Sequence, residues 1–228
     1  MARITIEVVF DFVCAWCFVG KRQLERALEL YRKTYPGGKQ DNIVVTWRPY
    51  FLNYNLVGNS VDKSELAKTK LSDMDSKTQA ALTRRMEQIG RGVGINFNWG
   101  GRIGNTRNAH RLVYASREKG QEVEDALVEA LFRAYHELEQ DISDSGVLRT
   151  IAVEAGLDEQ QADEMLGLSS LGEEVNAEAE AQKQRVGGVG VPCFFVQRDE
   201  KVGGAMDALE LMDAIVRAKQ QAKDDDPS

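Results

Sequence analysis

The chain has 228 residues, of which 43% are hydrophobic and 29% are charged, and its formal net charge at pH 7 is −7. This composition is typical of a globular protein with one large domain, or with one domain that carries a sizeable insertion. The negative charge disfavours nucleic acid as a partner, because a polyanion would be repelled. No apolar run approaches the roughly 20 residues that span a bilayer. We therefore expect neither a nucleic-acid partner nor association with a membrane.

The first ten residues predict a buried strand. Ile4, Ile6 and Val8 alternate with other side chains, and β-branched types dominate the segment. It contains one basic residue, Glu7 interrupts its apolar pattern, and no small-residue cleavage site follows, so it does not resemble a signal peptide. We therefore expect a cytoplasmic protein.

The next fifty residues predict a strand–helix–strand unit. From about Ala15 to Tyr35 the apolar residues recur at helical spacing, and Pro36-Gly37-Gly38 ends that helix. A second strand follows at Asn42–Leu52. A strand, a helix and a strand in this order form a βαβ unit with a right-handed crossover.

Residues 61 to 186 predict a block of helices in which we expect no strand. Six segments show helical periodicity: Ser76–Ile89, Thr106–Lys119, Val123–Leu138, Ser145–Ala155, Glu159–Leu166 and Glu173–Arg185. Strand signals return at Cys193–Gln197 and Lys201–Gly204, and a last amphipathic helix is expected at Met206–Ala218. A helical insertion thus separates two segments of one small α/β domain.

Two of the three cysteines, Cys14 and Cys17, stand at C-x-x-C spacing where the first strand gives way to the first helix. The sulfur of Cys14 would lie at the positive end of the helix dipole, which stabilises a thiolate. Cys17 lies one helical turn further and can attack a mixed disulfide on Cys14. The spacing and position predict thiol redox chemistry, with Cys14 as nucleophile and Cys17 as resolving thiol.

The same spacing also suits zinc ligands. A structural zinc site needs four ligands, and the sequence offers no second C-x-x-C and no H-x-x-x-H to complete one. We therefore predict no metal site.

Val191-Pro192 directly precedes a predicted buried strand, which is unusual because proline removes a hydrogen-bond donor from the sheet. A cis bond at Pro192, placed opposite Cys14 and Cys17, would leave the carbonyl and N–H of Val191 available to an incoming peptide or glutathione backbone. Cis bonds are only about 5% of X–Pro bonds, so this prediction depends on the cysteine pair.

Three segments carry a family resemblance. Phe10-Asp-Phe-Val-Cys-Ala-Trp-Cys-Phe-Val-Gly-Lys-Arg22 resembles the active-site segment of the DsbA-like thioredoxin family, in its FrnE-type branch. Asn105–Leu112 is similar to that branch's N-T-x-x-A-H-R-L segment, and Gly190–Val196 is similar to its cis-proline loop. The kinship extends to kappa-class glutathione transferases and 2-hydroxychromene-2-carboxylate isomerases, which generally have serine where this chain has Cys14.

The resemblance implies an α/β thioredoxin fold with a large all-helical insertion and a cis Pro192. The thioredoxin-like domain is expected at 1–60 and 187–222, the insertion at 61–186, and a disordered tail at 223–228. The dipeptide between the cysteines, Ala15-Trp16, departs from the family because many relatives have proline first. It also lacks a cationic side chain, so thiolate stabilisation would come mainly from the helix end.

Three residues near these motifs have two interpretations each. Cys193 is a small buried side chain or a third thiol close to the site. His110 braces its helix or approaches the site as a base or hydrogen-bond donor. Trp16 forms an exposed wall for substrate or packs against the insertion.

The leading hypothesis is a thiol–disulfide oxidoreductase whose substrate docks on Val191 and Pro192. It needs no cofactor beyond the redox-active pair Cys14–Cys17, and glutathione is a candidate co-substrate. The alternative is a glutathione-dependent isomerase or transferase of a small, aromatic metabolite, with Asn53 and Val191 holding glutathione. A third hypothesis is a binding or chaperone module that uses the helical block. The sequence leaves monomer and homodimer both open.

Overall fold

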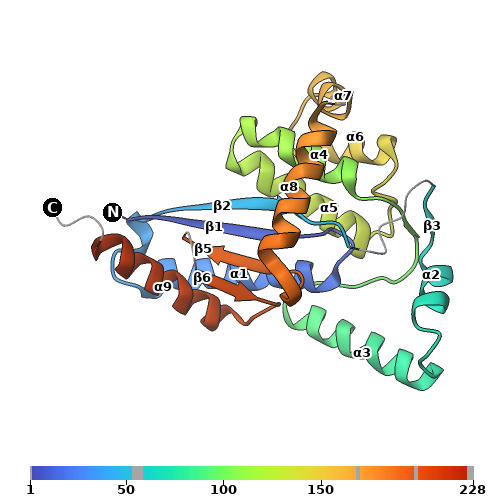
Figure 1. Cartoon of the computed structure of the whole chain (residues 1–228), viewed down its shortest axis with the longest axis horizontal. Coiled ribbons are helices and arrows are strands. Elements are labelled where there is room, and N and C mark those ends of the chain that lie inside the picture. Colours follow the sequence, from blue (N-terminus) through green and yellow to red (C-terminus); the bar gives the residue numbers. More distant parts are fainter. Residues whose placement is uncertain (1, 53–58, 168–169, 198–199, 225–228) are drawn as a thin grey trace. The chain divides into compact units, whose positions relative to one another are not determined.

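The computed structural model describes residues 2–52, 59–167, 170–197 and 200–224. The chain divides into two compact units, each formed around its own contacts. The first unit comprises Met1–Tyr50 and Ala179–Ser228, and the second comprises Phe51–Glu178. The first unit is discontinuous in sequence, because both ends of the chain contribute to one sheet (Figure 1).

The sheet of the first unit has four strands in the order β2-β1-β5-β6. Their bounds are Arg3–Phe10 for β1, Asn42–Pro49 for β2, Cys193–Val196 for β5 and Glu200–Gly203 for β6. β1 and β2 pair in parallel through the α1 crossover, whereas β5 pairs antiparallel with both β1 and β6. The N-terminal and C-terminal segments of the chain therefore meet between β1 and β5.

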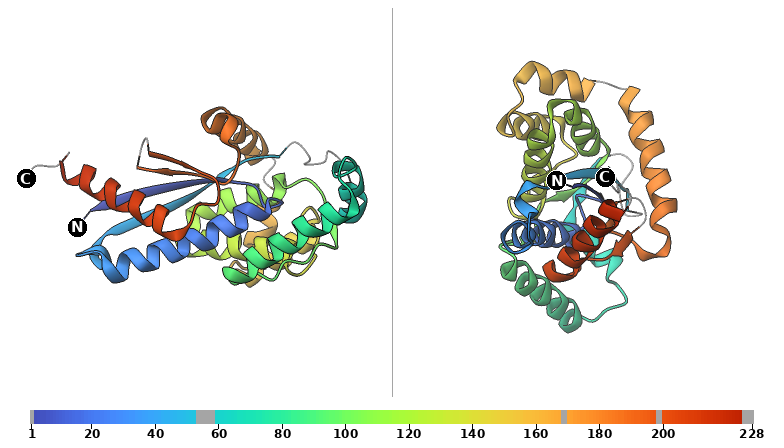
Figure 2. Two further views of the ribbon diagram at one scale, coloured as in Figure 1. Left: turned by 90° about the horizontal axis from the view of Figure 1, so that it is seen from below. Right: turned by 90° about the vertical axis from the view of Figure 1, so that its left-hand side faces the viewer.

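Two helices cover one face of this sheet. α1 (Ala15–Thr34) and α9 (Ala208–Asp224) lie side by side on that face (Figure 2). Ile4, Ile6 and Val8 of β1 are almost completely buried and alternate with more exposed residues. The alternation predicted from the sequence thus turns one side of β1 toward the core.

The second unit is mainly helical, as predicted. Its helices are α2 (Lys63–Lys70), α3 (Ser76–Gly92), α4 (Arg107–Ser116), α5 (Gln121–His136), α6 (Ser145–Glu154), α7 (Glu159–Gly167) and most of α8 (Ser170–Val186). A short 3₁₀ turn occupies Arg117–Lys119 in this unit, and two others occupy Gly38–Gln40 and Gly187–Val189 in the first unit. In the described part of the chain, no helix has both the length and the apolar character to cross a membrane.

Three details differ from the sequence-based expectation. The second unit contains a two-stranded antiparallel ladder, β3 (Val61–Asp62) with β4 (Arg102–Ile103), where no strand was expected. Strands of two residues are too short to show a period of two. Helix α2 was not predicted because its apolar residues form no stripe, and α9 extends to Asp224, into the expected tail. Residues 225–228 lie outside the described residues.

A buried ion pair ties the two ends of the first unit together. The Nζ of Lys219 on α9 donates to a carboxylate oxygen of Asp41, and the Tyr31 hydroxyl donates to the same oxygen at 2.7 Å. The backbone N–H of Ala2 donates to the other oxygen at 2.8 Å. These bonds lower the pKa of Asp41 to about 2 despite burial, which acts in the opposite direction.

We predict that Asp41→Asn destabilises the protein by about 3 kcal/mol, because it leaves the Lys219 ammonium buried without its counter-ion. The pKa of Asp41 is lower in the folded state, so its contribution is complete above about pH 4 and is lost as the pH falls toward 2. Urea denaturation across this range should show wild type and variant converging in acid. As a control, Glu29→Gln removes only a surface pair and should leave stability unchanged. A constant difference from pH 7 to pH 2 would contradict this account.

Candidate functional site

Cys14 is the N-cap residue of α1. Its backbone is extended, with φ −86° and ψ 108°, and its N–H donates to the Asp11 carbonyl at 3.1 Å. No side chain caps this fully described helix, and its first turn contains no acidic residue. The Cys14 sulfur therefore lies at the positive end of α1, whose own first turn carries no carboxylate.

Cys17 lies one turn into the same helix and is more deeply buried. Its side chain is 1% exposed, compared with 8% for Cys14, and both are free thiols. Burial raises the pKa of the Cys17 thiol well above its ordinary value, and the hydrogen bond and charge of the Cys14 sulfur raise it further. The two thiols of one motif thus occupy different environments.

The loop between α8 and β5 brings Val191 to Cys14. The Cys14 thiol donates to the Val191 carbonyl oxygen at 3.7 Å, although the two residues are 177 positions apart. The Val191–Pro192 peptide bond is cis. Gly190 has φ 79°, a backbone conformation that residues with a side chain rarely adopt, and Gly204 N–H donates to the Pro192 carbonyl at 2.9 Å. These contacts fix the loop at the N-terminus of α1.

Gly20 lets α1 approach this loop closely. A Cβ atom at position 20 would lie 2.9 Å from Cγ of Pro192 and 3.2 Å from the ring of Phe194. Neither neighbour is the free end of a flexible side chain, so a larger residue would displace α1 or the loop. Gly20 lies within the Phe10–Arg22 segment that carries the family resemblance. Nothing in the spacing of that segment indicates that Gly20 contacts Pro192.

Cys193 faces away from α1. The ring of Phe194 points toward Gly20, and successive residues of a strand point to opposite faces. Cys193 accordingly packs with Val9, Val186 and Phe195 in a cluster on the other face of the sheet. Its side chain is completely buried, and burial raises the pKa of its thiol. This position supports the interpretation of Cys193 as a core residue.

The remaining predicted site residues are placed as follows. Trp16 is 43% exposed on the first turn of α1, two residues from Cys14. His110 belongs to the second unit, where it is buried on α4 and its ring meets the Phe51 ring edge-on, with centroids 5.5 Å apart. Asn53 lies outside the described residues. The structure thus brings together Cys14, Cys17, Val191 and Pro192, all within the first unit.

Asp11 is a residue of the site that the sequence reasoning missed. It follows β1 directly and its side chain is fully buried. Its carboxylate charge contributes to the raised pKa of Cys17, whereas a hydrogen bond with its backbone acts in the opposite direction. A carboxylate at the end of an apolar strand, three residues before Cys14, was a signal available in the sequence.

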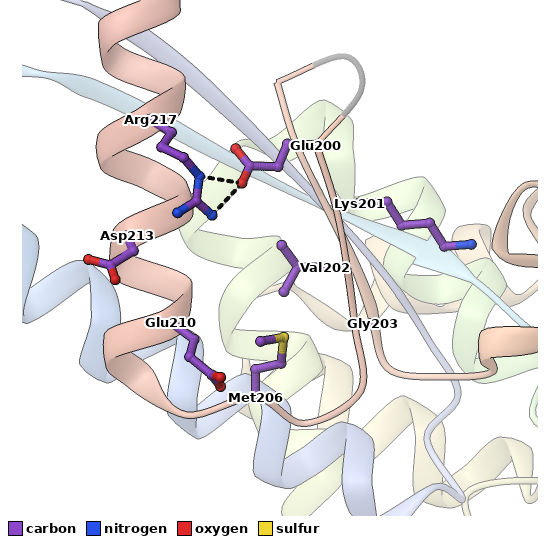
Figure 3. Close-up of a pocket in the computed structure, with 8 residues that line it drawn as sticks. All are labelled: Glu200, Lys201, Val202, Gly203, Met206, Glu210, Asp213 and Arg217. Carbon is purple, nitrogen blue, oxygen red and sulfur yellow. Dashed lines mark hydrogen bonds and ion pairs between the residues drawn. The ribbon is translucent and has the colours of Figure 1, made fainter.

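A shallow pocket of about 330 Å³ lies between β6 and α9 (Figure 3). Glu200 and Arg217 form an ion pair across it, and Val202 and Met206 line its apolar part. None of its lining residues belongs to the Cys14–Cys17 motif or to the Val191–Pro192 loop. This pocket is therefore not part of the candidate thiol site.

Comparison with known proteins identifies the family. A family model described as a DSBA-like thioredoxin domain matches residues 5–216. The chain therefore belongs to the DsbA-like thioredoxin family, which confirms the predicted thioredoxin fold with a helical insertion. None of the curated proteins matches the chain significantly.

Solved structures of several functional types share this fold. A probable DsbA oxidoreductase from Streptomyces coelicolor has a TM-score of 0.81 and 25% identity, over 94% of this chain and 89% of its own. A 2-hydroxychromene-2-carboxylate isomerase has a TM-score of 0.64 and 17% identity, over 97% and 99%. The cytosolic disulfide reductase DsbM from Pseudomonas aeruginosa, solved with GSH, has a TM-score of 0.57 and 18% identity, over 97% and 98%. The last two similarities show the fold alone.

We predict that Gly20→Ala lowers the free energy of unfolding by about 1–3 kcal/mol, because the added methyl group overlaps Pro192. The matched control is Gly92→Ala at the end of α3, where a Cβ atom meets nothing within 4 Å. That variant should be neutral or stabilised by up to about 1 kcal/mol. Chemical denaturation of both variants measures the difference, and equal effects would contradict the close approach at Gly20.

Proposed function

We propose that this protein is a thiol–disulfide oxidoreductase of the FrnE type, with Cys14 as nucleophile and Cys17 as resolving thiol. The observation that supports this most is the difference between the two thiols. Cys14 is at the helix N-terminus beside the Val191 carbonyl, whereas Cys17 is more deeply buried and has a raised pKa. A raised pKa keeps Cys17 protonated, which leaves Cys14, at the N-terminus of α1, as the thiol proposed to attack.

The proposed reaction has two displacement steps. In the first, the Cys14 thiolate attacks one sulfur of a substrate disulfide, the substrate S–S bond breaks, and the departing thiolate takes a proton. In the second, Cys17 loses its proton and attacks the Cys14 sulfur. The mixed disulfide then breaks, which releases the reduced substrate and leaves the Cys14–Cys17 disulfide. The reverse sequence oxidises a substrate dithiol, and neither direction requires a further cofactor.

The loop at Val191-Pro192 is proposed to dock the substrate backbone. Its carbonyl at Val191 already accepts a hydrogen bond from the Cys14 thiol, so a chain attached to that sulfur would begin beside the loop. Trp16 is proposed as an apolar wall for the residues that flank the substrate cysteine, because its ring is exposed next to the nucleophile.

Substitution of the two cysteines tests the assignment. We predict that Cys14→Ser reduces the rate of disulfide exchange by at least about 1,000-fold, because it removes the nucleophile. Cys17→Ser should still attack but should accumulate a mixed disulfide, since the resolving thiol is missing. Mass spectrometry after incubation with a disulfide peptide detects this adduct. Full activity of the Cys14→Ser variant would refute the proposal. So would an adduct on Cys17 in the Cys14→Ser variant, formed as fast as the wild-type protein reacts with the same peptide.

A second prediction concerns Trp16. Trp16→Ala should raise KM for a peptide disulfide about three- to ten-fold with little change in kcat, as expected for the loss of an aromatic contact of ~1 kcal/mol. The matched control is Trp99→Ala, which removes a ring of similar exposure, 40%, from the second unit. Steady-state kinetics on both variants separates the effects, and an unchanged KM for Trp16→Ala would exclude a docking role.

A glutathione-dependent isomerase or transferase is the second candidate function. It is favoured by the similarity in fold to the 2-hydroxychromene-2-carboxylate isomerase and to DsbM, which was solved with GSH. In this alternative Cys14 would orient glutathione, with Val191 as a candidate contact. Calorimetric titration of the reduced protein with reduced glutathione distinguishes the two, because only the alternative requires tight binding without an oxidised partner.

A non-catalytic chaperone is the third hypothesis. It would bind unfolded clients equally well without Cys14 and Cys17.

A further inference from the structure

Strand β6 forms one outer edge of the sheet in the first unit. It is the last strand in the order β2-β1-β5-β6, and within the described residues it pairs with β5 alone. The Gly204 N–H donates to the Pro192 carbonyl at 2.9 Å, and in an antiparallel ladder such bonded pairs recur at every second residue. The main-chain groups of Val202 therefore bond to β5, whereas those of Lys201 and Gly203 point outward. These outward groups can hydrogen-bond to an added strand.

The pocket between β6 and α9 opens beside this edge. Lys201, Val202 and Gly203 all line it. The Lys201 side chain points away from the other lining side chains (Figure 3), and its Nζ donates to the Val186 carbonyl. Lys201 therefore contributes its main chain to the pocket and not its charge. A residue of an added strand that lies opposite Val202, on the same face of the sheet, would place its side chain in this pocket.

The lining of the pocket is apolar on one side and acidic on the other. Val202 and Met206 supply the apolar part, and Arg217 is paired with Glu200. Three carboxylates line the pocket against the one guanidinium of Arg217, and they belong to Glu200, Glu210 and Asp213. The pocket therefore has an excess of negative charge.

Two of these carboxylates have no cationic partner within the described residues. Glu210 accepts the Asp207 N–H at 3.2 Å, and Asp213, one turn further along α9, makes no ion pair there. Figure 3 shows the Glu210 side chain extending toward Met206. A lysine or arginine side chain has an apolar stem and a cationic end. Its stem would lie on Met206 and its charge beside Glu210, so the pocket complements a basic residue.

We propose that the edge of β6 and the adjoining pocket form a docking site for an extended segment of a partner protein that carries a lysine or arginine. The segment adds a strand to the sheet by bonding to the main-chain groups of Lys201 and Gly203, and its basic side chain occupies the pocket. The site lies wholly within the first unit and uses neither Cys14 nor Cys17. It would recruit a partner and takes no part in the thiol reaction.

Peptide binding tests the preference for a basic partner. The probe is a cysteine-free hexapeptide that alternates valine and lysine, and its control has glutamate in place of lysine. Fluorescence polarisation should show that the wild-type protein binds the lysine peptide at least about ten times more tightly than the glutamate peptide. Equal affinity for the two peptides would overturn the proposal.

Two double variants test the place of binding. Glu210→Gln with Asp213→Asn should weaken binding of the lysine peptide at least about five-fold, because it removes both unpaired charges. Glutamine at position 210 can still accept the Asp207 N–H, so the start of α9 is preserved. Glu29→Gln with Glu180→Gln removes two exposed carboxylates of the same unit outside the pocket, and should bind like wild type. A loss in the pocket variant no larger than in this control would overturn the assignment to the pocket.

Hydrogen exchange tests the added strand. Saturation of the wild-type protein with the lysine peptide should slow exchange of the Lys201 and Gly203 amides at least about ten-fold, as resolved by NMR. The Val202 amide, which already bonds to β5, should change by less than about two-fold. Unchanged exchange at Lys201 and Gly203 would overturn the strand addition even where the peptide binds. The probe contains no sulfur, so none of these tests depends on disulfide exchange at Cys14.

Discussion

The candidate site depends on the close contact between α1 and the loop that precedes β5. Gly20 has no side chain, so Pro192 can lie against the helix at a distance that a Cβ atom would forbid. This contact holds the Val191 carbonyl at 3.7 Å from the Cys14 sulfur. Two segments separated by most of the chain are thus joined at one point. The mixed sheet beneath them, in which β5 inserts beside β1, supplies the rigid base for that contact.

The second feature of the site is the inequality of its thiols. Cys14 occupies the N-cap of α1, with no acidic side chain in the first turn. Cys17 is 1% exposed and lies within the electrostatic influence of the fully buried Asp11. Burial and neighbouring negative charge both favour the protonated form of Cys17. In a dithiol reaction the order of events follows from this difference. In the proposed reaction the thiol at the helix end reacts with substrate, and the buried thiol acts only when a mixed disulfide has formed beside it.

Much of this arrangement was predictable from the sequence, because it depends on local patterns. Helical periodicity located α1 and six helices of the second unit, and the C-x-x-C spacing located the dithiol at the start of α1. What was missed depends on contacts between distant residues. Nothing in the local sequence shows that Gly20 faces Pro192, or that Lys219 reaches Asp41. The ladder of β3 and β4 was missed for a different reason, since two residues cannot show a period.

The central claim, that Cys14 is the reactive thiol and Cys17 the protected one, is tested most directly by competitive alkylation. The reduced protein would be treated with a limiting amount of iodoacetamide at pH 7, and the label on each cysteine quantified by peptide mass spectrometry. The account predicts that Cys14 is labelled at least about ten times faster than Cys17, with Cys193 unlabelled until the protein unfolds. Equal labelling of Cys14 and Cys17, or faster labelling of Cys17, would contradict it.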